Sequence, residues 1–412
     1  MENSIQIRMF QAMHGDSFLI RCREGMNSIN ILVDAGPEEV YVRELKPVLE
    51  EMKNNGESID LFIVTHIDDD HIGGAIALIE DNGFANQPNV ISIREVWHNS
   101  YRHMQKKLPN TPPLNDEDRR WLIGFTKRWG RLLKARQKGK RTVSARQGSA
   151  LGALLLRGGY SWNSAVDGRA INIQTLPTYL INNLVCLKLL SPQEEQLANL
   201  KDYWYKELKK QGFKGNLTDD VEFDDAYEYF MAAVEEERRR IGKRQTSSSK
   251  YDWEILKNNC TQEDKTVKNG SSIAFVLEFD DERLLFAADA FPSVIAKSVR
   301  MHYPNETTPC QMSAIKISHH GSKYNTSIDF LNRVDAPLYL ISTNGARHGH
   351  PDVETLIKII NRPENRQRTL MFNYETNASR YLASSLEKLE NHSYSVVHKS
   401  IIDINKKGEY SE

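Results

Sequence analysis

Short apolar runs separated by turn residues dominate the first hundred positions of the chain. Two of them flank His14-Gly15-Asp16 and predict a hairpin, and the fully apolar run at 61–64 is typical of a strand covered on both faces. Helices are predicted at 43–54, where apolar residues recur on one face, and after Gly73-Gly74. Strands are predicted over residues 5–10, 18–22, 28–33, 61–64 and 90–97.

The pattern changes after about residue 100, where charged residues become frequent and apolar strands disappear until residue 184. Further strands are predicted at 184–190, 273–279, 284–288, 313–318 and 337–342. Helices are predicted at 115–137, 194–211, 220–241 and 353–361. We interpret the chain as one α/β domain, 1–412, with its core in 1–100, 181–192 and 257–412 and helical insertions at about 101–180 and 193–256.

Composition adds limits on partners and location. Lys and Arg number 54 and Asp and Glu 55 among 412 residues, so the net charge of −1 creates no general attraction for polyanions, and a nucleic-acid surface would have to be local. Neither a membrane-spanning run nor a secretion signal is recognisable, so we expect a cytoplasmic protein without membrane association. The four cysteines, Cys22, Cys186, Cys260 and Cys310, form no CxxC pair, and we expect free thiols.

The strongest chemical signal is His66-x-Asp68-x-Asp70-His71, which follows an apolar strand and precedes Gly-Gly and a helix. Imidazole and carboxylate donors this close together suit zinc, manganese or iron. An acidic helix N-terminus would also account for the aspartates. That alternative leaves the two histidines unexplained, so the segment predicts a metal site.

Three other predicted strands also end on possible ligands. Asp34 ends the strand at 28–33, Asp289 follows the apolar run 284–288, and His319-His320 follows 313–318. Each alone is weak evidence, because an aspartate at a strand end is more often a turn residue. Four strand ends that each present His or Asp predict one constellation.

These motifs resemble the metallo-β-lactamase superfamily, and most closely the soluble hydrolase domain of competence DNA-uptake channels (ComEC-type). The resemblance covers residues 5–98 and 270–355 and includes Gly15-Asp16-Ser17, the His/Asp segment with Asp68 in place of a second histidine, His319-His320-Gly-Ser, and Gly349-His350-Pro351. It implies an αββα sandwich that holds one or two divalent ions, zinc or manganese, at the strand ends.

The resemblance also implies roles for single residues. His66 and Asp68 would bind one ion, Asp70 and His71 the other, Asp289 would bridge them, and either His319 or, as we favour, His320 would complete the second. Asp34 would orient a ligand imidazole. Asp70 would orient or deprotonate the attacking water, and His350 would bind a phosphoryl oxygen or protonate the leaving group, unless it is only a turn residue. The metal ligands implied are His66, Asp68, Asp70, His71, Asp289 and His320.

Two departures from the family pattern stand out. Ala288 replaces a usual glycine, and the separate histidine of the third motif has no clear counterpart. His98 is its only positional candidate, and an ordinary histidine at a strand end is an equally good interpretation. We expect Lys316 to face away from the site.

A basic run in the first insertion is a candidate nucleic-acid surface. It contains Arg131, Lys134, Lys138 and Arg141, with Trp121 and Trp129 available to stack on bases. A solvated basic helix face is the alternative interpretation.

Three functions are compatible with these signals. The first is a phosphodiesterase or nuclease that uses a metal-activated water, acting on nucleic acid or on a small phosphodiester. The second is hydrolysis of a carboxylic ester, thioester or lactam on the same fold, and the third is a non-catalytic, metal-stabilised binding module. The ligand set argues against the third, and the basic run favours the first.

Overall fold

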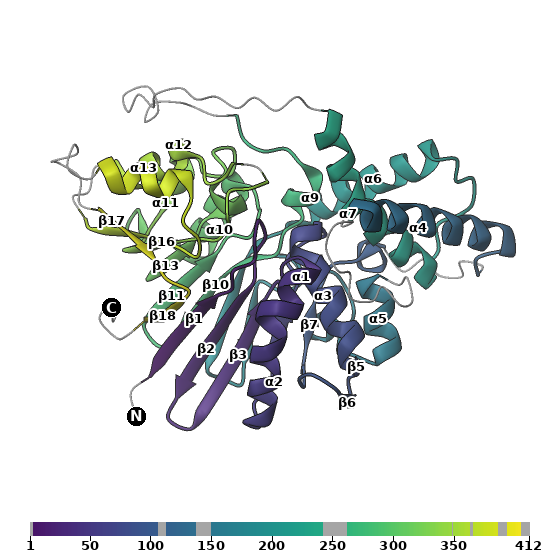
Figure 1. Ribbon diagram of the computed structural model, residues 1–412, viewed down its shortest axis with the longest axis horizontal. Coiled ribbons are helices and arrows are strands. Elements are labelled where there is room, and N and C mark those ends of the chain that lie inside the picture. Colours follow the sequence, from purple (N-terminus) through teal and green to yellow (C-terminus); the bar gives the residue numbers. More distant parts are fainter. Residues whose placement is uncertain are drawn as a thin grey trace.

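The computed structural model describes residues 3–105, 113–136, 150–241, 262–347, 349–362, 366–385 and 394–404 of the 412-residue chain. Two β-sheets pack face to face in its centre, with helices on both outer faces (Figure 1). This is the predicted αββα metallo-β-lactamase fold.

The first sheet has six strands in the order β18-β1-β2-β3-β4-β7. Their bounds are Ile401–Ile404, Ser4–Met9, Phe18–Glu24, Asn27–Val33, Leu61–Ile63 and Val96–Trp97. β1, β2 and β3 run antiparallel as successive hairpins, whereas β3, β4 and β7 are parallel. The hairpin predicted around His14-Gly15-Asp16 is confirmed.

The second sheet has eight strands in the order β17-β16-β15-β13-β11-β10-β9-β8. Their bounds are Tyr394–His398, Arg368–Phe372, Leu338–Ile341, Ala314–Lys316, Glu282–Phe286, Ala274–Phe279, Val185–Ser191 and Thr178–Ile181. The five strands from β11 to β17 are parallel. Two short pairs complete the strands: β5 Gly83–Phe84 with β6 Gln87–Pro88, and β12 Cys310–Gln311 with β14 Val334–Asp335.

Buried aliphatic and aromatic side chains fill the space between the sheets. Phe18 of the first sheet meets Phe286 of the second edge to face, with ring centroids 5.5 Å apart, and Phe275 stacks on Phe286. Burial of apolar surface here is the main force that holds the two sheets together.

Helices cover the outer faces. Beside the first sheet lie α1 Glu38–Val40, a π-helical turn Tyr41–Leu45, α2 Lys46–Asn54, α3 Asp69–Asn82 and α5 Leu151–Gly158. Beside the second lie α10 Pro292–His302, α11 Ile328–Arg333, α12 Val353–Ile360 and α13 Asn377–Ser385. No described helix is long and apolar enough to cross a membrane.

Helix α9 Val267–Gly270 and a 3-10 turn at Ser318–Gly321 belong to the core part of the chain. The helices of the insertions are α4 Asp116–Arg136, α6 Glu194–Lys210 and α7 Val221–Ile241, with 3-10 turns at Tyr101–Met104 and Ser164–Val166. Their apolar faces continue the cluster under α2 and α3, with Trp204 and Phe230 fully buried in it. The insertions therefore share a core with the outer face of the first sheet.

Three local predictions differ from the structure or reach beyond it. Of the strand predicted at 90–97, only Val96–Trp97 forms a strand, β7. Ile93 makes an isolated bridge to Ile59 and does not extend it. Helix α5 lies in a region where the charged sequence predicts no regular apolar element. Of the four cysteines, Cys22, Cys186 and Cys310 are free as predicted, and Cys260 lies outside the described residues.

Candidate metal centre

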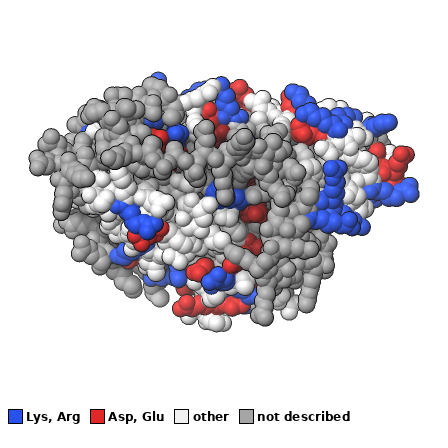
Figure 2. Space-filling view, turned by 45° about the horizontal axis from the view of Figure 1, so that its top comes forward, with Lys and Arg blue, Asp and Glu red and all other residues white. Residues whose placement is uncertain are grey.

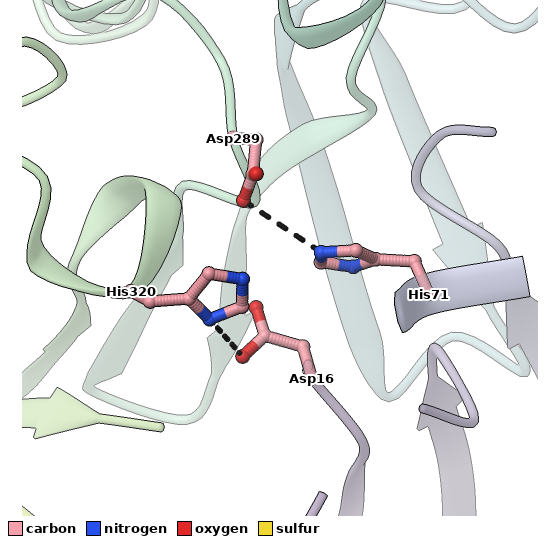
Figure 3. A group of neighbouring side chains, drawn as sticks. All are labelled: Asp16, His71, Asp289 and His320. Atoms are coloured by element: carbon pink, nitrogen blue, oxygen red, sulfur yellow. Dashed lines mark ion pairs between the residues drawn. The ribbon is translucent and has the colours of Figure 1, made fainter. Parts of the chain in front are cut away.

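Parallel strands end at one edge of each sheet, and the predicted ligands lie there. Asp34 follows β3, His66 follows β4, Asp289 follows β11 and His320 follows β13. One donor atom from each of Asp16, His71, Asp289 and His320 lies within 4.8 Å of all the others, and all four residues are buried (Figure 3). Figure 3 shows the four side chains pointing toward one another from opposite sides.

Asp16 is a member of this group that the sequence analysis did not include among the ligands. It lies in the turn between β1 and β2, which packs against the start of α3: a Cβ added at Gly15 would be 1.9 Å from the carbonyl oxygen of Asp70. Only glycine allows this approach. The only sequence signal for Asp16 was the Gly15-Asp16-Ser17 motif. An aspartate after glycine is common in turns, so the motif alone did not indicate a ligand.

Asp34 orients His71 from behind. Its Oδ2 lies 2.8 Å from His71 Nδ1, and its two carboxylate oxygens also accept hydrogen bonds from the backbone and hydroxyl of Thr65, both at 2.8 Å. Because a carboxylate only accepts, the neutral imidazole of His71 carries its proton on Nδ1 and its lone pair on Nε2. This is the orienting position expected for Asp34.

The same tautomer follows for His66 and His320. The hydroxyl of Thr65 donates to Asp34, so its oxygen accepts from His66 Nδ1 at 3.1 Å. His320 Nδ1 donates to the carbonyl oxygen of Ser342 at 2.9 Å. Both Nε2 lone pairs are therefore directed into the centre.

These lone pairs are the clearest evidence that a cation fits. The Nε2 atoms of His66, His71 and His320 and the Oδ1 atom of Asp289 are buried and have no hydrogen-bond partner. Buried polar atoms are nearly always paired, and bound metal ions would satisfy all four. The donor set of imidazoles and carboxylates suits zinc, manganese or iron.

Asp289 lies between two groups of donors. Its Oδ2 is 3.7 Å from His66 Nε2, and its Oδ1 is 3.9 Å from His71 Nε2. On the first side, Asp68 Oδ2 is 3.8 Å from His66 Nε2. On the second, Asp70 Oδ2 is 3.8 Å from His320 Nε2. Asp289 therefore faces both groups of donors, and its bridging role stays a prediction.

Two buried lysines reach the centre. Lys316 forms an ion pair with Asp16, so our expectation that it faces away was wrong: simple alternation fails because β13 ends at this residue and the chain turns. Lys268, on the short helix α9, forms an ion pair with Asp68 and donates to the carbonyl oxygen of Met231 at 3.0 Å. No sequence signal marked Lys268, because it belongs to none of the motifs.

The electrostatics of the metal-free centre favour bound cations. Burial raises the pKa of Asp16, but Lys316 and His320 outweigh it and hold that pKa well below the usual range. Burial likewise opposes ionisation of Asp289, yet the surrounding imidazoles lower its pKa. Burial lowers the pKa of His71, and Asp34, Asp289 and Asp70 together raise it well above the ordinary value. The carboxylates of this centre therefore stay anionic despite burial, and a bound cation would balance their charge.

Left-handed backbone conformations concentrate around the ligands. Asp34, Ala288, His319 and His320 all have positive φ, between 46° and 54°. Such conformations cost non-glycine residues free energy and collect at functional sites. Ala288, where the resemblance implies glycine, is therefore a strained position in this chain.

The two remaining histidine candidates have different surroundings. His98 faces the insertion, with Nε2 2.9 Å from Glu228 Oε1 and its ring stacked on Trp162, so the structure supports the ordinary strand-end interpretation and not the ligand. His350 lies at the edge of the centre, with its ring centroid 5.5 Å from that of His319 and Nδ1 3.4 Å from Asp352 Oδ2.

The nucleic-acid candidates lie in α4 and beyond. Arg131 is exposed, whereas the side chain of Lys134 and all of Lys138 and Arg141 lie outside the described residues. The suggestion that Trp129 is available to stack on bases was wrong, and Trp121 is half-buried. Trp129 is buried against Phe230, and Trp121 stacks on Phe125, because both face the core of the insertion.

Comparison with known proteins agrees with this geometry. Residues 12–131, which include the His66–His71 segment, match the metallo-beta-lactamase superfamily. The chain carries a metallo-β-lactamase superfamily domain. Most members of this superfamily are metal-dependent hydrolases. The match extends to the superfamily and not to the competence-type branch.

Other comparisons add little. No curated protein matches the chain significantly. A solved structure of a mutant CmlA beta-hydroxylase aligns with 98% of this chain and 54% of its own, at 10% identity and a TM-score of 0.33. The chain thus spans about half the length of that protein, and a likeness this low carries no argument about function.

Proposed function

We propose that the protein is a metal-dependent hydrolase that cleaves phosphodiester bonds. The observation that carries the proposal is the convergence of three buried imidazole lone pairs around Asp289. Bound divalent ions would lower the pKa of a water molecule and polarise the scissile bond.

The residues of the chain have separate tasks in this chemistry. His66, Asp68, Asp70, His71, Asp289 and His320 would hold the ions, with Asp16 as a further candidate. Asp70 stays anionic because His71, Arg347 and His320 lower its pKa against the effect of burial. An anionic Asp70 is able to accept a hydrogen bond from the attacking water and orient it. His350, which lies at the rim beside His319, would contact the leaving group.

The guanidinium of Arg347, beside the centre, supports a phosphoryl substrate. Arg347 is half-buried, lies 2.6 Å through Nη1 from His14 Nε2, and its charge acts on Asp70. A guanidinium in this position suits the anionic oxygens of a phosphodiester better than a neutral carboxylic ester. The Gly15-Asp16-Ser17 turn and the histidine pair, which resemble the competence-type hydrolases, favour a polynucleotide.

The surface adds a second support for nucleic acid. Lys and Arg side chains gather over the end of the molecule formed by the insertion (Figure 2). The exposed residues there include Lys127, Arg128 and Arg131 of α4 and Lys206 and Lys209 of α6. Local basic patches of this kind bind phosphates even when the net charge is near zero.

The test compares two chromogenic substrates, a phosphodiester and a carboxylic ester, after chelation and after return of Mn²⁺ or Zn²⁺. We expect metal-dependent turnover of the phosphodiester, with manganese at least as effective as zinc because Asp68 replaces an imidazole with a harder ligand. Asp70→Asn should lower the phosphodiester kcat by at least about 100-fold at equal metal content. Faster cleavage of the carboxylic ester, or turnover unaffected by chelation, would contradict the proposal.

A further inference from the structure

His319 faces the side of the centre to which, among the ligands named above, only His66 contributes an imidazole. Its Nε2 lies 3.6 Å from Asp289 Oδ2, and the same oxygen lies 3.7 Å from His66 Nε2. His320 instead faces Asp70, at 3.8 Å. The adjacent histidines thus point to different sides of Asp289.

The backbone explains how neighbouring residues achieve this. In an extended strand successive side chains point to opposite faces, which would carry one of the two histidines away from the centre. Here both residues are left-handed, with φ of 48° and 54°, and Gly321 follows with φ of 89°. The ring centroids are 5.9 Å apart and the planes are inclined by 67°. Two strained residues in succession indicate that both side chains have a function.

A network of amides fixes the tautomer of His319. Asn325 donates through Nδ2 to Asp264 Oδ2 at 3.1 Å and to the carbonyl oxygen of Asp289 at 3.2 Å, so its Oδ1 must face His319. His319 Nδ1 lies 3.0 Å from that Oδ1, closer than the 3.3 Å to the amide nitrogen of Asn269. The proton therefore lies on Nδ1, and the Nε2 lone pair is directed at Asp289, as in the other three histidines.

We infer that His319 is the missing ligand of the first metal position. It joins His66, Asp68 and the shared Asp289, while His320 joins Asp70, His71 and Asp289 at the second. His319 thus replaces the third-motif histidine that His98 does not provide. The inference rests on the proposed metal-dependent function.

The test counts bound ions in the full chain. Protein dialysed to equilibrium against free Mn²⁺ should hold two ions per chain, and His319→Ala should hold one. Adding His66→Ala to His319→Ala should leave one ion, because both ligands belong to the same position. Adding His71→Ala instead should leave none, because both positions are then damaged.

Two further variants separate ligation from structural damage. Asn325→Ala keeps His319 but removes the group that fixes its tautomer, so the affinity for one ion should fall about 10- to 100-fold. His302→Ala, on α10 with Nε2 bonded to the carbonyl oxygen of Leu189, should keep both ions. Circular dichroism checks folding, and His319→Gln replaces the alanine variant if that variant does not fold.

Each other result overturns the inference. It fails if the wild type holds one ion or if His319→Ala holds two. It also fails if the double variant with His66→Ala does not hold one ion or the double variant with His71→Ala still holds one. A wild type that holds no ion would contradict the proposed function as well, so the two failures are distinguishable.

Discussion

The carboxylate of Asp34 lies 2.8 Å from Nδ1 of His71 and fixes the imidazole so that its other nitrogen faces the metal centre. The same aspartate holds Thr65, which in turn contacts His66. One buried residue outside the ligand set thus orients two ligands from successive parts of the His/Asp segment.

Asp34→Asn tests this relationship. An amide that presents NH₂ to His71 or to Thr65 breaks one of these hydrogen bonds, so we expect metal affinity to fall about 10- to 100-fold. Isothermal titration with Mn²⁺ measures the change. Asp281→Asn, at an exposed position, is the control and should bind like the wild type. Equal affinity in Asp34→Asn would show that the contact does not orient a ligand.

Lys268→Met tests the buried ion pair with Asp68. The side chains are only 4% and 11% exposed, so removal of the ammonium leaves a buried carboxylate without its partner. We expect the free energy of unfolding of the metal-free protein to fall by about 3–5 kcal/mol, with partial recovery when Mn²⁺ is added. Urea unfolding measures both values, and Lys297→Met, exposed on α10, serves as the control. An unchanged urea midpoint would mean that Asp68 does not need Lys268.

Metal binding should weaken as pH falls. Burial lowers the pKa of His71 and of His320, but neighbouring carboxylates outweigh burial and raise both pKa values above the ordinary 6.5. The metal-free protein thus holds these protons to higher pH than a free imidazole does, and an ion must displace them. We expect affinity to change by about tenfold per pH unit for each proton displaced. Titrations in buffers of different ionisation enthalpy count these protons, and a pH-independent affinity would contradict the assignment.

The same pKa shifts determine how the stability of the metal-free protein changes with pH. Because the folded-state pKa of these histidines is raised, their contribution is fully present below about pH 6.5 and is lost as pH rises through the raised value. The depressed pKa values of Asp16, Asp70 and Asp289 act in the other direction and remove stability in acid. Metal-free protein should therefore be most stable at mildly acidic pH.

The basic part of the insertion should affect only long substrates. Replacing Arg131, Lys134, Lys138 and Arg141 by Gln should weaken nucleic-acid binding and flatten its salt dependence, by a slope of about 0.7–0.9 for each phosphate that the variant no longer neutralises. Cleavage of a small chromogenic phosphodiester should stay nearly unchanged. If the wild type shows no salt-dependent binding to DNA or RNA, a small phosphodiester becomes the better substrate.

Sequence patterns located the strand ends well, because apolar runs followed by His or Asp leave few alternatives. The segment from His66 to His71, together with Asp289 and His320, was found in this way. Parallel pairing then places the ends of β3 and β4 at one edge of the first sheet and the ends of β11 and β13 at one edge of the second.

The residues of the centre that the sequence did not predict depend on contacts between distant segments. Asp16 enters the centre only because Gly15 packs against α3, and Lys268 only because α9 lies beside Asp68. His319 faces the centre only because two successive residues are left-handed, a conformation that side-chain patterns do not predict for histidine. His98 had the right position in the chain, but Glu228 on a distant helix holds it elsewhere.

The most direct test of the account is the metal content of the protein purified without added metal, beside that of Asp289→Ala. Asp289 faces both groups of donors, so the account predicts one or two divalent ions per chain in the wild type and a large loss in the variant. A wild type without bound metal, or an Asp289→Ala variant that retains full occupancy while folded, would contradict it.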